Sequence, residues 1–281
     1  MAIEPESRNE YTFSPERLTF PVYALDGIGG CGKSHTSKKL AEEFKKDGMV
    51  VATPKIGGLG NSPRVQRLKE IQEYRTHLAE DGQTSKFLQD KDRDRIFRLA
   101  TKYQIREFIK ESKETRYNLA IIDRTPLMSW VFANASNPEN PYIDEIYNEG
   151  MKATASLGVS KVFLLDVEPE TAYSRMIARY CIGTDDVDSQ ILLACQTIRA
   201  SKDSTRTIQT RVKNLLAKPN SLQAKQFESW DLIPMETTIR ERIAHQQILK
   251  QAQQRFGLEY QIIDAEGPIE SVVATIKQSI N

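Results

Sequence analysis

The sequence predicts a three-layer α/β/α fold built on a five-stranded parallel sheet. Five short apolar runs, each typical of a buried strand, are spread along the 281 residues. Amphipathic helical patterns separate these runs, as the right-handed crossovers of a parallel sheet require. A glycine-rich motif of the kind that binds phosphate stands between the first run and the first helix. Together these three observations predict the fold class.

The composition is that of a globular protein, with 39% hydrophobic residues, 27% charged residues and a net charge of +1. This balance gives no global argument for a nucleic-acid or membrane partner, and no apolar run approaches the ~20 residues that span a bilayer. Residues 1–18 predict a flexible N-terminal arm without a signal peptide, ahead of one domain over 19–281. Cys31, Cys181 and Cys195 lack metal or redox spacing, which favours a cytoplasmic location.

The first strand, Val22–Leu25, leads into a phosphate-binding loop, or P-loop. The residues at 27, 32, 33 and 34 match the pattern G-x-x-x-x-G-K-[ST]. Its glycines let successive backbone N–H groups point at phosphate oxygens, and the next helix adds its positive N-terminal end. We expect Lys33 to be an exposed cation that reaches the β- and γ-phosphates, and the Ser34 hydroxyl to ligate Mg²⁺. The predicted phosphate cradle consists of Gly27, Ile28, Gly29, Gly30, Cys31, Gly32, Lys33, Ser34 and His35.

The first helix is predicted over 34–46, with Leu40, Ala41 and Phe44 on one face and Gly48 at its C-terminal cap. Further strands are predicted at residues 49–53, 118–124, 161–166 and 260–264. Further helices are predicted to begin near Pro63 and at Glu168–Ala172, and to cover 92–113, 236–256 and 269–280. In the helix over 236–256, the apolar residues in helical register are Ile239, Ile243, Ile248 and Ala252. Loops are expected over 55–63 and 134–142, and the pattern of 182–226 is harder to assign.

Several charged residues follow the strands, and the carboxyl ends of parallel strands meet at one edge of a sheet. The residues expected at this edge are Lys33, Ser34, Lys55, Asp123, Arg124, Asp166, Arg175 and Arg179. Phosphoryl transfer depends on positioning and on neutralising negative charge. A magnesium ion, a lysine and one or two arginines supply that neutralisation. The sequence therefore predicts a phosphoryl-transfer site at this edge.

The order of these motifs resembles thymidylate kinase and its P-loop nucleotide-kinase relatives, from about residue 19 to the C-terminus. Besides the P-loop, the stretches that carry the resemblance are Thr53–Gly58, Ile121–Thr125 followed by Ser129, Phe163–Ala172 and Tyr260–Ala265. The resemblance implies ATP and Mg²⁺ as cofactors and a nucleoside monophosphate as acceptor, with dTMP favoured. An insertion over about 180–228 is longer than the family's usual lid, which implies an enlarged helical lid.

The resemblance also implies individual roles. The residues implied in catalysis are Lys33, Asp123, Arg124, Arg175 and Arg179. The residues implied in acceptor binding are Lys55, Lys102 and Arg124, and those implied in metal binding are Ser34 and Asp123. Arg124 would clamp the acceptor phosphate, and Arg175 or Arg179 would neutralise transition-state charge from the lid. The stretch 196–225 of that lid holds seven basic residues and one acid.

Departures from the family pattern keep two other functions open. The family carries a carboxylate inside the P-loop, at the position where this sequence has Gly29. The family's Arg-Glu-Pro sequence is replaced here by residues Pro54–Ile56. A deoxynucleoside kinase on the same scaffold would need a carboxylate base for its hydroxyl acceptor. The loop after the second strand carries Lys55 and no acid, so that alternative requires Asp123 as the base. A nucleotide-binding regulatory protein without acceptor turnover is the third alternative.

The partners expected are ATP and a nucleoside monophosphate. We expect no membrane partner, and no nucleic acid because few aromatic residues interleave with the cations of the lid. A homodimer is left open.

Overall fold

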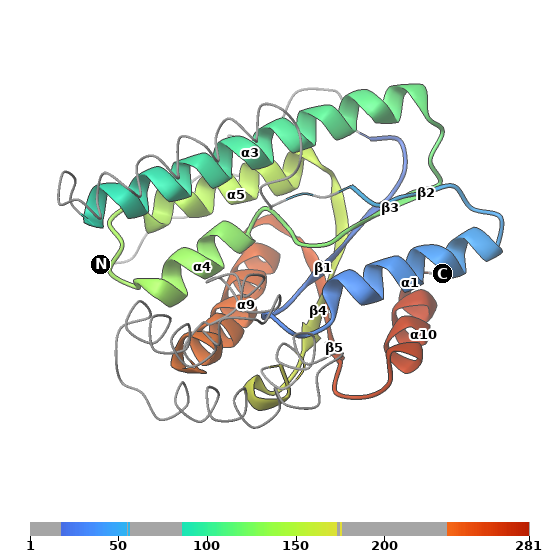
Figure 1. Ribbon diagram of the computed structural model, residues 1–281. Coiled ribbons are helices and arrows are strands. Elements are labelled where there is room, and N and C mark those ends of the chain that lie inside the picture. The colour runs from blue at the N-terminus through green and yellow to red at the C-terminus, as the bar shows by residue number, and fades with distance from the viewer. Residues whose placement is uncertain (1–17, 55, 57–85, 173–174, 176–234, 281) are drawn as a thin grey trace, which may run out of the picture.

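The computed structural model describes residues 18–54, 56, 86–172, 175 and 235–280 (Figure 1). They form an α/β fold around a five-stranded sheet whose neighbouring strands are all parallel, in the order β2-β3-β1-β4-β5. The strands are β1 (Val22–Asp26), β2 (Val51–Ala52), β3 (Leu119–Ile122), β4 (Val159–Asp166) and β5 (Glu259–Asp264). The prediction of a five-stranded parallel sheet is confirmed.

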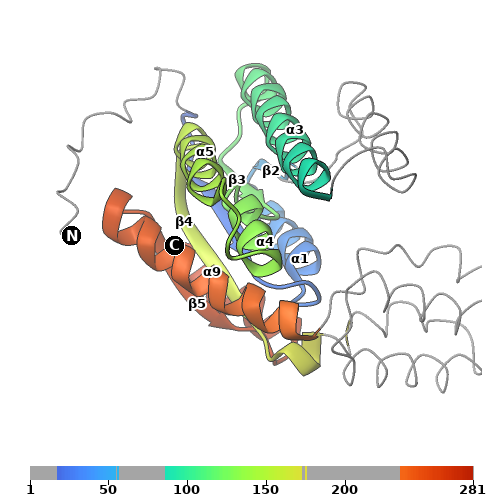
Figure 2. The ribbon, with the colours of Figure 1, turned by 90° about the vertical axis from the view of Figure 1, so that its left-hand side faces the viewer.

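Helices cover both faces of the sheet. One face is covered by α1 (Lys33–Lys46) and α10 (Ile269–Ile280), which lie side by side (Figure 1). The other face is covered by α3 (Lys86–Glu114), α4 (Met128–Ser136), α5 (Ile143–Ser156) and α9 (Met235–Phe256). Figure 2 shows α4 beside α9 on that second face. The described residues therefore form three layers, with the sheet in the middle.

Alternating side chains of each strand feed two separate hydrophobic clusters. In β1, Val22 and Ala24 pack under α3, α4, α5 and α9, whereas Leu25 packs under α1 and α10. In β4, Leu164 packs under α3, α4, α5 and α9, whereas Leu165 packs under α1 and α10. Because both faces are covered, a strand needs apolar residues at consecutive positions, and this explains the uninterrupted apolar runs of the sequence.

The region between β3 and β4 is more helical than the sequence analysis predicted. The loop expected over 134–142 overlaps the end of α4, which continues to Ser136, and the loop occupies only the following residues. α5 was not predicted. Gly150 on α5 lets this helix pack closely, because a Cβ there would lie 3.2 Å from the carbonyl oxygen of Pro126.

The buried face of α9 contains only part of the apolar register of the sequence. Ile239 and Ile243 are 42% and 49% exposed, whereas Ile248 and Ala252 are buried. Glu241 and His245 are buried as well. The five-residue step from Ile243 to Ile248 cannot remain on one face of a helix with 3.6 residues per turn. The series 241, 245, 248 and 252 keeps the steps of four and three residues that one helix face requires.

Several predictions lie outside the described residues. These concern the arm over residues 1–17, the helix expected to begin near Pro63, the lid over about 180–228, and the site residues Lys55 and Arg179. The division into an arm and one kinase domain stays a prediction.

Candidate functional site at the carboxyl edge of the sheet

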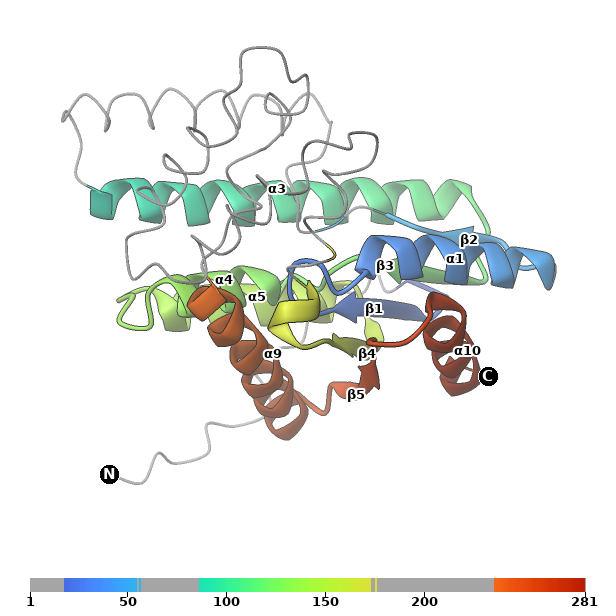
Figure 3. The ribbon, with the colours of Figure 1, turned by 60° about the horizontal axis from the view of Figure 1, so that its bottom comes forward.

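The turn between β1 and α1 uses the backbone freedom of its glycines. Gly27, Gly30 and Gly32 have φ angles of 141°, 82° and 96°, which residues with a Cβ rarely adopt. At Gly30 a Cβ would also overlap the carbonyl of Ala172, in the helical turn that follows β4 (Figure 3). No described side chain caps the first N–H groups of α1, which begins at Lys33. These N–H groups are the kind of donors that bind anions.

Lys33 is buried, with only 6% of its surface exposed, so the expectation of an exposed cation was wrong. The loop folds around the ammonium group. Lys33 Nζ donates to the carbonyl oxygens of Gly27 at 2.7 Å and Ile28 at 2.9 Å, and lies 3.5 Å from Cys31 Sγ. Phosphate oxygens carry charge and accept stronger hydrogen bonds than carbonyl oxygens. The same ammonium is therefore able to exchange the loop carbonyls for phosphate.

Ser34 and Asp123 come together across the edge of the sheet. The Ser34 hydroxyl donates a short hydrogen bond to Asp123 Oδ2, although 89 residues separate the two. Asp123 Oδ1 is buried and has no hydrogen-bond partner among the described residues. Mg²⁺ prefers oxygen ligands and is bound in proteins through one or two carboxylates plus substrate phosphates. A hydroxyl and a carboxylate beside a glycine-rich turn fit that preference.

Within the described ranges, no group of three or more His, Cys, Asp or Glu residues is arranged to hold a metal ion. An ion held by Ser34 and Asp123 would therefore need oxygen atoms from nucleotide or water to complete its coordination.

Arg124 directly follows Asp123 and adopts an unusual backbone conformation, with φ at 118°. Its guanidinium carbon lies 5.8 Å from the centre of the Phe132 ring on α4. The next residue, Thr125, is bound by Asp26 at the end of β1. Burial raises the pKa of Asp26, while the hydrogen bonds from Thr125 and the charges of Lys33 and Arg124 oppose that rise.

Two buried titratable residues of α9 also belong to this neighbourhood. Burial raises the pKa of Glu241 to about 7, opposed by the charges of Lys33 and Arg124. Burial lowers the pKa of His245 to about 3, and the same two cations add to that effect. The Gly27 carbonyl is the smallest influence on the pKa of His245, and it acts in the opposite direction. Neither imidazole nitrogen has a partner in hydrogen-bond geometry among the described residues, and the same holds for Glu241 Oε2.

A forked ion pair holds α9 in this position. Arg242 Nε and Nη2 donate to the two carboxylate oxygens of Asp166 at 2.7 and 2.8 Å, and Nη1 lies 2.8 Å from Glu168 Oε2. A small pocket beside this pair is lined by Gly27, Ile28, Leu164, Leu165, Asp166, Arg242 and His245. The glycine-rich turn after β1, the end of β4 and α9 therefore meet at one place.

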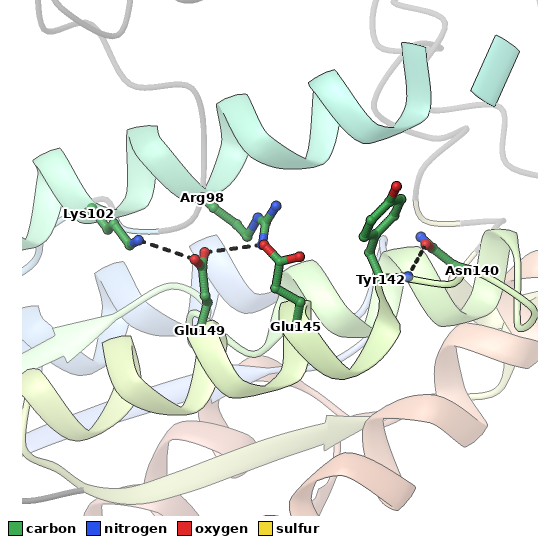
Figure 4. Close-up of polar contacts among 6 residues, drawn as sticks. All are labelled: Arg98, Lys102, Asn140, Tyr142, Glu145 and Glu149. Atoms are coloured by element: carbon green, nitrogen blue, oxygen red, sulfur yellow. Dashed lines mark hydrogen bonds and ion pairs between the residues drawn. The ribbon is translucent and has the colours of Figure 1, made fainter. Parts of the chain in front are cut away.

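Two predicted site residues make other contacts. Arg175 donates from Nη1 to the carbonyl of Ala265 at 2.8 Å and from Nη2 to that of Glu266 at 2.9 Å. Its described contacts thus tie the segment after β4 to the loop after β5. Lys102 on α3 lies 3.5 Å from Glu149 on α5, as Figure 4 shows.

Arg98, one helical turn before Lys102 on α3, also connects this helix with α5. Arg98 Nη1 lies 3.0 Å from Glu145 Oε1 and 3.3 Å from Glu149 Oε2 (Figure 4). Among the described residues, no contact joins Lys102 to Lys33 or Arg124. The described contacts of Lys102 therefore connect α3 with α5.

Sequence reasoning did not identify Asp26, Glu241, Arg242 or His245 as site residues. For Glu241 and His245 a signal existed, because the spacing 241, 245, 248 and 252 competes with the isoleucine pattern and keeps better helical register. For Asp26 the signal was a carboxylate at the carboxyl end of an otherwise apolar strand.

Comparisons with known proteins add no assignment: no protein-family model matches the chain, and no curated protein matches it. None of the helices within the described ranges combines the length and apolar character that a membrane crossing needs.

Proposed function

We propose that the protein is an ATP-dependent P-loop kinase of the thymidylate kinase-like type, with a nucleoside monophosphate as acceptor and dTMP favoured. The observation that carries the proposal is the hydrogen bond between Ser34 and Asp123 beside Lys33. It joins two motifs that phosphoryl transfer needs, a hydroxyl at a helix N-terminus and a carboxylate after a neighbouring strand.

In the proposed reaction, an acceptor phosphate oxygen bonds to the γ-phosphorus of ATP. The bond from that phosphorus to the β,γ-bridging oxygen breaks, and ADP leaves with the electron pair. Lys33 and the N–H groups of the loop hold the donor phosphates. Ser34 and Asp123 would hold Mg²⁺, which would supply positive charge beside those phosphates. Arg124 binds the acceptor phosphate. This acceptor is already anionic, so the reaction needs no base.

One observation favours a second candidate, a kinase with a hydroxyl acceptor such as a deoxynucleoside. A hydroxyl must lose a proton as it attacks, and a base works best when its pKa is near the operating pH. Glu241 has a buried carboxyl whose pKa is raised to about 7 within the influence of Lys33 and Arg124. The two candidates thus differ in whether Glu241 takes part in the chemistry.

The test is an assay of ADP formation by the full-length chain with ATP and Mg²⁺. The acceptors compared are dTMP, the other nucleoside monophosphates and thymidine. Turnover of a monophosphate supports the proposal, and turnover of thymidine alone replaces it with the second candidate. ATP binding without turnover of any acceptor overturns both and favours the regulatory alternative.

A matched pair of lysine variants of α1 accompanies the assay. Lys33→Ala should lower the rate by a factor on the order of 10²–10³, the typical effect of removing one charge-stabilising donor from such a site. Lys39→Ala removes an exposed lysine that pairs with Glu270 at 2.9 Å and should leave the rate unchanged. Equal rates for the two variants would contradict the role given to Lys33.

A further inference from the structure

Asp26 is the carboxylate at the end of β1, and it has no role in the proposed reaction. It is 1% exposed. Its Oδ1 accepts from the backbone N–H of Thr125 at 2.8 Å, and its Oδ2 accepts from the Thr125 hydroxyl at 2.6 Å. Thr125 is itself fully buried. Both oxygens of the Asp26 carboxylate thus accept hydrogen bonds from Thr125, which follows the neighbouring strand β3 and lies 99 positions away in the sequence.

The residue next to Thr125 is held in an unfavourable backbone conformation. Arg124 has a φ of 118°, a region that residues other than glycine rarely occupy and that persists only where surrounding contacts enforce it. Contacts anchor the chain on both sides of it. Asp123 is bound by Ser34 on one side, and Thr125 is bound by Asp26 on the other.

The two anchors join the same pair of segments. Asp26 and Ser34 stand at the two ends of the phosphate loop, and Asp123 and Thr125 flank Arg124. The guanidinium of Arg124 then lies over the Phe132 ring. The backbone on the C-terminal side of Arg124 is therefore held by the two hydrogen bonds that Asp26 accepts from Thr125.

We propose that Asp26 is a positioning residue, which holds the backbone at Thr125 so that Arg124 is directed at the site of phosphoryl transfer. This proposal rests on the proposed function in one respect only, namely that Arg124 binds the acceptor phosphate. The orientation of Arg124 exists in the free protein and can be measured without a substrate.

The first experiment measures that orientation directly. The Nε–H signal of Arg124 in a ¹⁵N–¹H NMR spectrum of the full chain is assigned by its loss in Arg124→Lys. The Phe132 ring is expected to shift this signal from the position of a solvated arginine. Thr125→Val keeps the shape of the side chain but removes the hydroxyl donor. Asp26→Asn replaces one acceptor with a donor. Both variants should move the Arg124 signal towards the solvated value.

Two controls separate positioning from general damage to the fold. Thr125→Ser keeps both donors and should keep the Arg124 signal. Thr154→Val removes another buried hydroxyl, which donates to the Gly150 carbonyl at 2.8 Å within α5, and should also keep it. An unchanged Arg124 signal in Thr125→Val overturns the proposal. If Thr125→Val does not fold, Asp26→Asn gives the same decision.

The second experiment uses the phosphoryl-transfer assay. Thr125→Val should lower kcat by roughly 10- to 100-fold, the scale of a misplaced group in a catalytic site, and leave KM for ATP unchanged. In an Arg124→Ala background the same change should have no further effect on kcat. An additive effect there means that Asp26 does not act through Arg124 and overturns the proposal. Failure of every variant and of the native chain to form ADP overturns the proposed function, and the NMR comparison still decides the role of Asp26.

Discussion

Arg242 on α9 forms a two-point ion pair with Asp166 at the carboxyl end of β4, with distances of 2.7 Å from Nε to Oδ1 and 2.8 Å from Nη2 to Oδ2. Beside this contact, His245 of the same helix lines a small pocket together with Gly27 and Ile28 of the glycine-rich turn. Arginine is suited to such a two-point contact because its planar guanidinium matches both oxygens of a carboxylate.

Arg242→Lys should lower the free energy of unfolding by about 1–2 kcal/mol, because lysine cannot reproduce the two parallel hydrogen bonds of a half-buried charged pair. The measurement is urea unfolding followed by circular dichroism. The control is Lys39→Ala, which breaks an exposed ion pair between α1 and α10 and should leave the unfolding midpoint unchanged. Equal stability of Arg242→Lys and the native chain would contradict the role of the fork.

Arg124 allows a test of backbone strain. Arg124→Gly and Arg124→Ala both remove the guanidinium and its contact with Phe132, but only glycine adopts a φ of 118° without penalty. The glycine variant should therefore be more stable than the alanine variant by about 1 kcal/mol in urea unfolding. An alanine variant of equal or greater stability would show that the backbone at this position is not strained.

The fit of the phosphate loop against the turn after β4 is tested by two glycines with the same φ of 82°, Gly30 and Gly48. A Cβ at Gly30 would overlap the Ala172 carbonyl, whereas a Cβ at Gly48 would meet no atom within 4 Å. Gly48→Ala should cost only the conformational penalty, about 1–2 kcal/mol. Gly30→Ala should cost clearly more, with a lower thermal midpoint and weaker ATP binding. Equal losses in the two variants would mean that the loop and the turn do not pack as described.

Glu241 and His245 should make opposite contributions to the pH dependence of stability. The pKa of Glu241 rises from 4.5 to about 7 on folding, so the folded chain binds the extra proton and stability falls as pH rises through that range. The pKa of His245 falls from 6.5 to about 3, so the unfolded chain binds the extra proton and stability falls as pH drops below 6.5. Between pH 4.5 and 6.5 the two contributions cancel.

Single variants should separate the two contributions. Relative to the native chain, the free energy of unfolding of Glu241→Gln should rise by about 1.4 kcal/mol per pH unit between the unfolded and folded pKa values of Glu241. The free energy of unfolding of His245→Gln, relative to the native chain, should rise by a similar amount per pH unit as pH falls below the ordinary pKa of histidine. The charges of Lys33 and Arg124 and the buried Asp26 are retained in both variants, so they drop out of the comparison. Urea unfolding at a series of pH values measures both slopes, and parallel curves for the three proteins would refute the assignment.

Much of the fold could be predicted from local patterns. The five strands, α1 with its buried Leu40, Ala41 and Phe44, and the helix over 269–280 all agree with the structure. Uninterrupted apolar runs identify strands covered on both faces, and a regular apolar stripe identifies a helix that packs on one side. The approach of Ser34 to Asp123 was also predictable, because the ends of parallel strands meet at one edge.

The partners of the polar side chains depended on the tertiary structure. The sequence placed Lys33 in the phosphate loop, but only the folded loop shows its ammonium buried against two carbonyl groups. Arg175 and Lys102 are charged residues whose described contacts are with Ala265, Glu266 and Glu149. A hydrogen bond depends on which distant backbone or side chain lies within about 3 Å, and local periodicity carries no information about that.

The sequence by itself determined the five strands, most of the helices outside the region between β3 and β4, and the glycine-rich turn after β1. The tertiary structure decided that α9 turns Glu241 and His245, and not Ile239 and Ile243, towards the sheet. The physical reason is that a helix with apolar residues on two faces can bury either one. Its orientation is chosen by the surface on which it packs, here the hydrophobic cluster that buries Ala244, Ile248, Leu249 and Ala252.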